Sequence, residues 1–321
     1  MSIKLPVALI AAAAALAVPS AASAQAPPCA TQGPVGAAYA TGVNCRTLVH
    51  DGVQRRFEVY VPASAGEHPP VVFMFHGSGG TGEQFLKISG WREEADRRGL
   101  IAVFPTGERY RMTDTGAMET KWADFHLVDD IDETETPPAD DVGFVDDMLA
   151  DLEAELPVDT HRVYASGFSN GANFAARLAV DRSETFAAAA FAAGGLSEVH
   201  APARAVPTYA IAGTLDAKLL ARLSTPLTEL PLDPVEILAT PELDAYLSTA
   251  VQTLGLDEAL YGVKAQPHST SFRWPATGND PVFRFGMLEG VTHEYPNGTN
   301  NPGGFTAASE FAAFFAEHRL P

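Results

Sequence analysis

Short, mostly apolar segments alternate along the chain with segments of helical spacing, and this alternation constrains the fold more than any other feature. Strands without polar alternation are typical of sheets that are covered on both faces. When helices join such strands, the sheet is mostly parallel and lies between two helical layers. We therefore predict an α/β fold with one central sheet in a single domain. The expected strands are 56–61, 71–75, 100–104, 163–165, 186–193, 207–212 and 282–288, and the expected helices are 83–98, 142–156, 172–180 and 306–318.

Two long stretches interrupt this rhythm. Residues 109–141 are polar and acidic, and residues 219–243 are rich in leucine and proline without a clear period. Loops this long in a compact domain are usually functional or disordered, with a solvated surface loop as the plain alternative. We expect 217–243 to form a lid or an insertion.

The first residues have the pattern of an export signal. Lys4 supplies a positive charge, 6–18 is an apolar run rich in alanine and leucine, and Ala22-Ser23-Ala24 is a small-x-small cleavage site. A membrane anchor is the alternative, but the run is shorter than the ~20 residues needed to span a bilayer. We expect cleavage of a 1–24 signal peptide, a mature catalytic domain of residues 25–321 that is secreted to the periplasm or the medium, and no membrane partner.

The two cysteines of the chain bear on the redox compartment and on metals. Cys29 and Cys45 are expected to form one disulfide in an oxidising compartment, with two free thiols as the alternative. The chain contains neither a CxxC pair nor an HExxH motif, so the sequence gives no support for a zinc site.

The charge of the chain argues against nucleic acid as a partner. Asp and Glu number 40 and Lys and Arg number 21, giving a net charge of −19. Nucleic-acid binding needs a cationic surface that displaces counterions. A neutral or cationic partner is favoured, although a local basic patch remains compatible with this total.

A glycine–serine corner stands between an expected strand and an expected helix. Gly167-Phe168-Ser169-Asn170-Gly171 matches G-x-S-x-G, which is weak evidence alone but is here in the strand–turn–helix context of a nucleophile elbow. Such a turn projects the serine hydroxyl above the sheet. The N–H of Asn170, at the helix start, would face a developing oxyanion.

A nucleophilic serine needs a base and an acid, which follow it in the order acid, then histidine, in chains with this elbow. Asp216 follows the strand 207–212 and is the expected acid; a local turn or a helix cap is its alternative role. His293 follows the strand 282–288 and is the expected base. His268, in a polar stretch before that strand, and His318, at the end of the last helix, are less suitably placed.

The loop after strand 71–75 is the expected second half of an oxyanion hole. It reads His76-Gly77-Ser78-Gly79-Gly80, and the N–H of Ser78 could pair with that of Asn170. Gly77, Gly79 and Gly82 also spell the dinucleotide fingerprint G-x-G-x-x-G, with Glu108 as a ribose-binding acid. That interpretation leaves the elbow, the acid and the histidine unexplained.

Together these motifs resemble the secreted α/β-hydrolases of the polyhydroxybutyrate-depolymerase and feruloyl-esterase type. The resemblance runs from about Arg56 to the end and is carried by HGSGG, WREEADRRGLIAVFPTG, DDVGFVDDML, RVYASGFSNGA, GTLD and THEYPNG. It implies an α/β-hydrolase fold with Ser169 as nucleophile, Asp216 as acid and His293 as base, and with Asp141 as a structural helix cap. The chain departs from the family's frequent pattern at Gly171-Ala172 and at Tyr295, and in having no cysteine after Cys45.

The expected activity is ester hydrolysis through an acyl-enzyme, without a metal or an organic cofactor. The expected substrate is a polymer ester, either a polyhydroxyalkanoate or a feruloyl-type ester, and the expected contacts are His76, Gly77, Trp122, Phe168 and Tyr295, with ordinary packing as the alternative for the aromatic rings. The same family includes poly(aspartic acid) hydrolases, so amide cleavage is a second hypothesis. A binding protein that has lost catalysis is a third, which the intact serine, acid and histidine disfavour.

Overall fold

The computed structural model describes residues 31–34, 36, 38–275 and 282–321. The expected signal peptide, 1–24, and Cys29 lie outside the described residues, so the signal peptide and the disulfide to Cys45 stay predictions.

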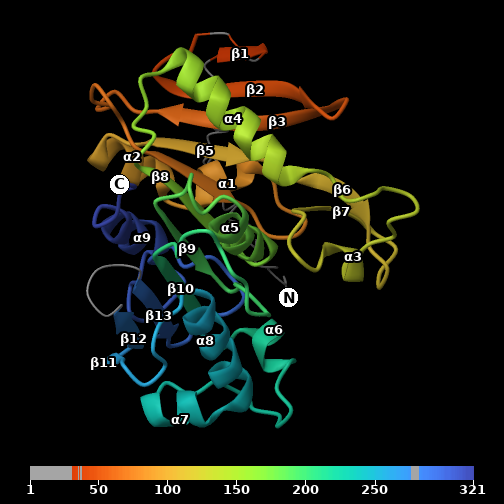
Figure 1. Ribbon diagram of the computed structural model, residues 1–321. Coiled ribbons are helices and arrows are strands. Elements are labelled where there is room, and N and C mark those ends of the chain that lie inside the picture. Colours follow the sequence, from red (N-terminus) through yellow and green to blue (C-terminus); the bar gives the residue numbers. More distant parts are fainter. Residues whose placement is uncertain (1–30, 35, 37, 276–281) are drawn as a thin grey trace, which may run out of the picture.

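One 11-stranded sheet runs through the molecule (Figure 1). Its central strands, from β5 to β13 in spatial order, are all parallel, whereas β2, β3, β11 and β12 add antiparallel pairs at the two sides. The mostly parallel sheet is thus confirmed. In spatial order the strands are β1 (Thr31–Pro34), β2 (Gly42–His50), β3 (Val53–Val61), β5 (Ile101–Pro105), β4 (Val71–Phe75), β8 (Val163–Phe168), β9 (Ala188–Ala192), β10 (Thr208–Gly213), β13 (Val282–Leu288), β12 (Ser269–Pro275) and β11 (Gly262–Gln266).

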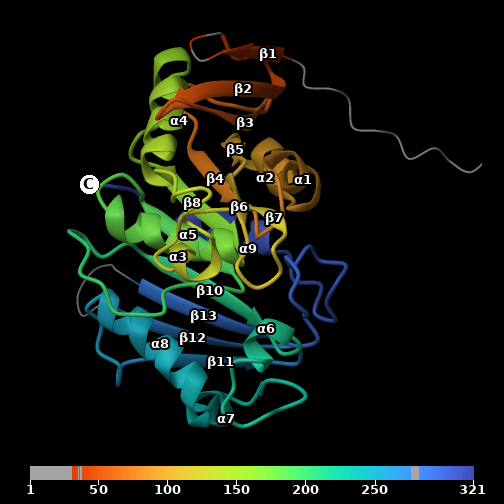
Figure 2. The ribbon, with the colours of Figure 1, turned by 90° about the vertical axis from the view of Figure 1, so that its right-hand side faces the viewer.

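Helices cover both faces of the sheet, as Figure 2 shows. The residues of β4 alternate between two hydrophobic cores: Val71, Phe73 and Phe75 join one core, and Val72 and Met74 join the other. This explains why the strand is apolar throughout. The first core includes α4 (Asp141–Glu155), α5 (Asn170–Asp181), α7 (Pro234–Ala239) and α8 (Pro241–Thr253), and the second includes α1 (Gly82–Ile88), α2 (Trp91–Arg98) and α9 (Ala307–Phe315).

The expected helix 83–98 is in fact two helices. Gly90 stands between α1 and α2 with a φ of 79°, a left-handed conformation that interrupts the helical run. Trp91 then begins α2 and is fully buried, stacked against Phe315 of α9. A glycine within a helical pattern was therefore the boundary between two packed elements.

The two irregular stretches contain secondary structure that the sequence did not predict. In and next to 109–141, β6 (Glu108–Arg111) and β7 (Met118–Lys121) form a two-stranded sheet beside the main one, followed by α3 (Leu127–Asp130) (Figure 1). The 217–243 segment contains α6 (Ala217–Leu220), α7 and the start of α8. Within the described residues, no helix combines the length and the apolar character needed to cross a membrane.

Candidate active site

Ser169 occupies the sharp turn between β8 and α5. Its φ of 53° and ψ of −121° are strained for a residue with a side chain, and strain of this kind is concentrated at functional sites. The glycines on either side are required by space. A Cβ on Gly167 would lie 2.0 Å from the carbonyl oxygen of Gly171, and a Cβ on Gly171 would lie 2.3 Å from that of Phe75. Strand, turn and helix therefore approach as closely as the sequence pattern predicted.

The hydroxyl of Ser169 is in hydrogen-bond contact with an imidazole. The Oγ of Ser169 lies 2.8 Å from Nε2 of His293, and Nδ1 of the same ring lies 2.8 Å from Oδ2 of Asp216. An ionised carboxylate only accepts hydrogen bonds, so Nδ1–H must be the donor to Asp216. The neutral ring then has a lone pair on Nε2, which accepts from the serine O–H. The structure thus brings the three side chains together in the order that proton transfer requires.

Burial and backbone donors fix Asp216 in this arrangement. Its side chain is fully buried, and its Oδ1 accepts hydrogen bonds from the N–H groups of Lys218 and Leu219 at 2.9 and 3.2 Å, at the start of α6. Burial raises the pKa of this carboxyl, but the bond and charge of His293 and the two N–H donors outweigh burial and hold the pKa below its usual value. Asp216 is therefore ionised at neutral pH. It caps a helix with one oxygen and orients His293 with the other.

The other two histidines considered from the sequence are held elsewhere. His268 pairs through Nδ1 with Glu289, at 2.5 Å. His318 is buried and packs edge-on against Phe314 of α9. Of these candidates, His293 is the histidine that the structure places against Ser169.

The glycine-rich loop after β4 lies against the serine. A Cβ on Gly77 would be 3.2 Å from the Cβ of Ser169 and 3.0 Å from the ring of Phe168, so a larger residue would crowd the elbow. Asn170 is the first residue of α5, and its N–H has no carbonyl one turn earlier in the helix to which it can donate. Ser78 is half-buried in the same loop.

His76 supports this loop from within the core. Its Nδ1–H donates to the carbonyl of Gly77 at 2.7 Å, and its Nε2 accepts the N–H of Gly107 at 3.0 Å. Burial lowers the pKa of His76 to about 4, so the ring is neutral near pH 7 and can use one nitrogen as an acceptor. Because His76 is fully buried, it is a support of the loop, which corrects its expected role as a substrate contact.

Trp122 and Tyr295 are buried supports as well, contrary to the expectation that they line the substrate groove. The indole N–H of Trp122 donates to the carbonyl of His76 at 3.0 Å, and the side chain is fully buried. Tyr295 is 5% exposed and packs edge-on against Phe85 and Phe168. Of the expected aromatic contacts, only Phe168 is half-buried, with its ring centroid 5.1 Å from that of His293.

Asp124 belongs to the site, and sequence reasoning missed it. Its Oδ2 accepts hydrogen bonds from the side-chain amides of Asn170 and Asn173, at 2.9 and 3.1 Å. The Oδ1 of Asn170 in turn accepts the backbone N–H of Trp122 at 2.7 Å. These bonds fasten the segment after β7 to the first turn of α5. Asp124 stands in an irregular acidic stretch, where no period or motif distinguishes it from its neighbours.

The expected cap of α4 is displaced by one residue. Asp140, not Asp141, caps the helix, because its Oδ1 accepts the N–H of Gly143 at 2.9 Å. Asp141 is buried, pairs with Arg55 at 2.6 Å and accepts the backbone N–H of Ala123 at 2.7 Å. Its role is structural, as the family resemblance implied, but it serves as a buried ion-pair partner.

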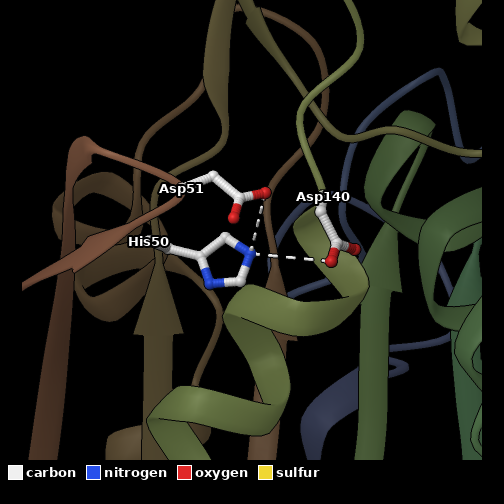
Figure 3. Close-up of side chains that lie close together, drawn as sticks. All are labelled: His50, Asp51 and Asp140. Carbon is white, nitrogen blue, oxygen red and sulfur yellow. Dashed lines mark ion pairs between the residues drawn. The ribbon is translucent and has the colours of Figure 1, made fainter.

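Among the described residues, one group of side chains could hold a metal ion: His50, Asp51 and Asp140 (Figure 3). The Nε2 of His50 lies 3.8 Å from the Asp51 carboxylate and 3.7 Å from that of Asp140, and its Nδ1 lies 2.8 Å from Asp147. Burial lowers the pKa of His50, but the three carboxylates outweigh burial and raise it. The three carboxylates thus favour the protonated form of the ring, and the group ties the β2–β3 turn to α4.

Two curated relatives of this chain are named as esterases. It is 29% identical over 136 residues to "Feruloyl esterase B" of Thermothelomyces thermophilus, covering 42% of this chain and 43% of that protein. It is 27% identical over 169 residues to "Bifunctional acetylxylan esterase/xylanase XynS20E" of Neocallimastix patriciarum, covering 51% of this chain and 22% of the relative. The chain therefore spans less than half the length of these curated relatives.

Among solved structures, an S-formylglutathione hydrolase from Agrobacterium tumefaciens has a similar fold. The TM-score is 0.55 at 19% sequence identity, and the alignment covers 88% of this chain and 98% of that one. This likeness confirms the predicted α/β-hydrolase fold. A family model described as "Esterase PHB depolymerase" matches residues 56–251, more than half of the chain. The chain belongs to the esterase PHB depolymerase family.

Proposed function

We propose that this protein is a serine hydrolase that cleaves carboxylic esters through an acyl-enzyme formed on Ser169. The observation that carries the proposal is the continuous chain of two 2.8 Å contacts from the serine hydroxyl through His293 to Asp216. A hydroxyl becomes a useful nucleophile only when a base takes its proton as it attacks. Here the base is in contact with the hydroxyl before the substrate arrives, and its orientation is fixed from behind.

In the first half-reaction, Nε2 of His293 removes the proton of Ser169 while the serine oxygen attacks the ester carbonyl. The ring then carries a positive charge, which the ionised Asp216 stabilises without taking the proton. His293 returns the proton to the leaving alcohol, and the carbonyl re-forms as an acyl-enzyme. Water enters in place of the alcohol, loses a proton to His293 and releases the acid product.

Two backbone N–H groups would hold the negative oxygen of each tetrahedral intermediate. The N–H of Asn170 is at the positive end of α5, and that of Ser78 is in the loop packed against Ser169. His76 and Trp122 support the loop from the core, and Asp124 fastens the helix start. Donors held this rigidly need no rearrangement when charge develops, which is the source of their catalytic effect.

The proposed substrate is an ester within a polymer, of the polyhydroxyalkanoate or feruloyl type. The family assignment and the names of the curated relatives support this class. Phe168, which is half-buried beside His293, is the proposed substrate contact, together with Gly77, which is buried but lies against Ser169. Export after removal of residues 1–24, with a disulfide between Cys29 and Cys45, is part of the same proposal and suits an enzyme that meets an insoluble polymer.

The test is a side-by-side hydrolysis screen of the wild type and Ser169→Ala. The substrates are polyhydroxybutyrate film, methyl ferulate, nitrophenyl esters and poly(aspartic acid). We expect the wild type to cleave esters and Ser169→Ala to lose at least about 10³-fold in kcat with an unchanged fold. The matched control is Ser166→Ala, which removes a buried hydroxyl from β8, the strand that leads to Ser169, and should keep ester cleavage. Ester hydrolysis that survives in Ser169→Ala contradicts the proposal. Cleavage of poly(aspartic acid) and of no ester would show that the enzyme is an amide hydrolase and would also contradict it.

A further inference from the structure

We infer that Thr214 is a positioning residue that locks the Asp216 turn, the His293 loop and the 217–243 segment to one another. This inference rests on the function proposed above, because it concerns how the same acid and base are held. Thr214 is fully buried directly after β10, two positions before Asp216. Its hydroxyl bonds to Glu229 and Gly290, so its effect on Asp216 and His293 is exerted through the residues that it ties together.

The hydroxyl of Thr214 makes two directed hydrogen bonds to two different segments. It donates to Oε1 of Glu229 at 2.7 Å, and it accepts the backbone N–H of Gly290 at 2.9 Å. These directions follow from chemistry, since a carboxylate can only accept and an N–H can only donate. Gly290 begins the loop that carries His293, and Glu229 belongs to the 217–243 segment. A single oxygen thus joins the elements that bear the acid and the base.

The backbone around Thr214 connects the same segments. Its N–H donates to the carbonyl of Leu288, and its own carbonyl accepts the N–H of Leu230 at 2.7 Å. The next residue, Leu215, donates to the carbonyl of Val291 at 3.0 Å. The Asp216 turn is therefore held between the His293 loop on one side and residues 229–230 on the other.

The contact between the turn and the loop has little room to adjust. A Cβ on Gly213 would lie 2.2 Å from the carbonyl oxygen of Val291. The backbone of the Asp216 turn is therefore in contact with that of the His293 loop next to Thr214. Gly290 has a φ of +68°, a left-handed conformation that glycine readily adopts. The hydrogen bond from its N–H to the Thr214 hydroxyl helps to hold this conformation. Without the hydroxyl, this partly buried N–H would lose its acceptor, and the loop would find a new position at some cost.

The arrangement also couples the 217–243 segment to the acid–base pair. The segment leaves the sheet directly after Asp216 and returns to Thr214 through Glu229 and Leu230. Glu229 is exposed, so its carboxylate would be hydrated if it were released, and a mutation of Glu229 removes its bond to Thr214 without changing a buried side chain. The Thr214 hydroxyl is thus the side-chain link from this segment to the Asp216 turn, beside the backbone bond of Leu230.

The experiment compares kcat, KM and thermal stability of Thr214→Val, Thr214→Ser and a matched control, Thr208→Val. Valine keeps the shape of threonine without its hydrogen bonds. Thr208 is at the opposite end of β10, is buried, and donates its hydroxyl to the carbonyl of Val206 at 2.9 Å. We expect Thr214→Val to lose about ten-fold or more in kcat with KM nearly unchanged, because misplacement of reacting groups by less than 1 Å is felt mainly in kcat.

Serine at 214 restores the hydroxyl and is expected to keep kcat within about two-fold of wild type. Thr208→Val is expected to lose stability with kcat within the same range. Glu229→Ala, an exposed change that leaves the fold intact, should lower kcat by a smaller factor and add nothing to Thr214→Val, since the two residues share one bond.

The inference is overturned if Thr214→Val keeps wild-type kcat, or if Thr208→Val loses kcat equally, because either result reduces Thr214 to a stability role. Should Thr214→Val fail to fold, Thr214→Ser and Glu229→Ala decide, and wild-type kcat in Glu229→Ala overturns the coupling of the 217–243 segment. Failure of the proposed function is a separate result, seen as activity that persists in Ser169→Ala.

Discussion

Nδ1 of His293 lies 2.8 Å from Oδ2 of Asp216, although 77 residues separate them along the chain. Asp216 follows β10 and His293 follows β13, and these strands are parallel neighbours in the sheet. Parallel neighbours end at the same edge, so residues that follow them can meet there. The sheet topology, more than any local motif, makes this contact possible.

Asp216→Asn should reduce kcat severely while leaving α6 in place. The amide oxygen can still cap the N–H groups of Lys218 and Leu219, but an amide does not hold the His293 ring as a carboxylate does. We expect a loss of about 10³- to 10⁴-fold in kcat with a small change in Tm. Steady-state kinetics and thermal unfolding of the same sample check both parts, and a loss under ten-fold would argue against the role of the carboxylate.

Gly171→Ala should damage the fold at the elbow. The added Cβ would meet the carbonyl oxygens of Phe75 and His76 at 2.3 and 2.4 Å, and both are backbone atoms that cannot turn aside. We expect a loss of about 1–3 kcal/mol or more in the free energy of unfolding, together with loss of activity. Gly66→Ala is the matched control, because no atom lies within 4 Å of its added Cβ. Equal stability of the two variants would show that the elbow accommodates the added Cβ, against this prediction.

Phe168→Ala should weaken substrate binding. The ring is half-buried and lies beside His293, whereas Tyr295 is buried behind it. We expect KM for an aromatic or polymeric ester to rise about three- to ten-fold, since the accessible part of the ring supplies apolar contact area. Tyr295→Phe keeps the buried ring and should leave KM unchanged. An unchanged KM in Phe168→Ala would remove Phe168 from the substrate site.

His50 should make the stability of the protein depend on pH. Asp147, Asp51 and Asp140 raise its folded-state pKa above the ordinary 6.5, against the lowering effect of burial. The folded state then binds the proton more tightly than the unfolded chain does. The stabilisation is complete below pH 6.5 and is lost as the pH rises through the folded-state pKa.

The measurement is the free energy of unfolding of wild type and His50→Gln, by denaturant titration at about pH 5.5 and about pH 9. We expect the advantage of the wild type to be larger at the lower pH. His161→Gln serves as control, since His161 is half exposed. A wild-type advantage that grows with pH would contradict the predicted sign.

The central strands and the reacting residues could be predicted from the sequence for a physical reason. Strands covered on both faces must be apolar throughout, so β4 and β13 appear in the sequence with their exact bounds, 71–75 and 282–288. The elbow is visible because Gly167 and Gly171 are required by space. Residues that end such strands are few, which is why Ser169, Asp216 and His293 could be selected.

The remaining features depend on tertiary contacts that leave no local pattern. β11 is exposed along its whole length, so its sequence shows no alternation of buried and exposed residues that would predict a strand. The sequence does not distinguish aromatic rings that face a substrate from rings that pack in the core, such as Trp122 and Tyr295. Asp140 and Asp141 are adjacent acids, and the local pattern could not decide which of them caps α4.

Covalent labelling of the protein with a fluorophosphonate, followed by peptide mass mapping, shows directly whether Ser169 is an activated nucleophile. We expect one adduct, on the peptide that contains Ser169, with labelling abolished in Ser169→Ala and strongly slowed in His293→Ala. An adduct on a different residue, or ester hydrolysis by a protein whose Ser169 stays unlabelled, would contradict it.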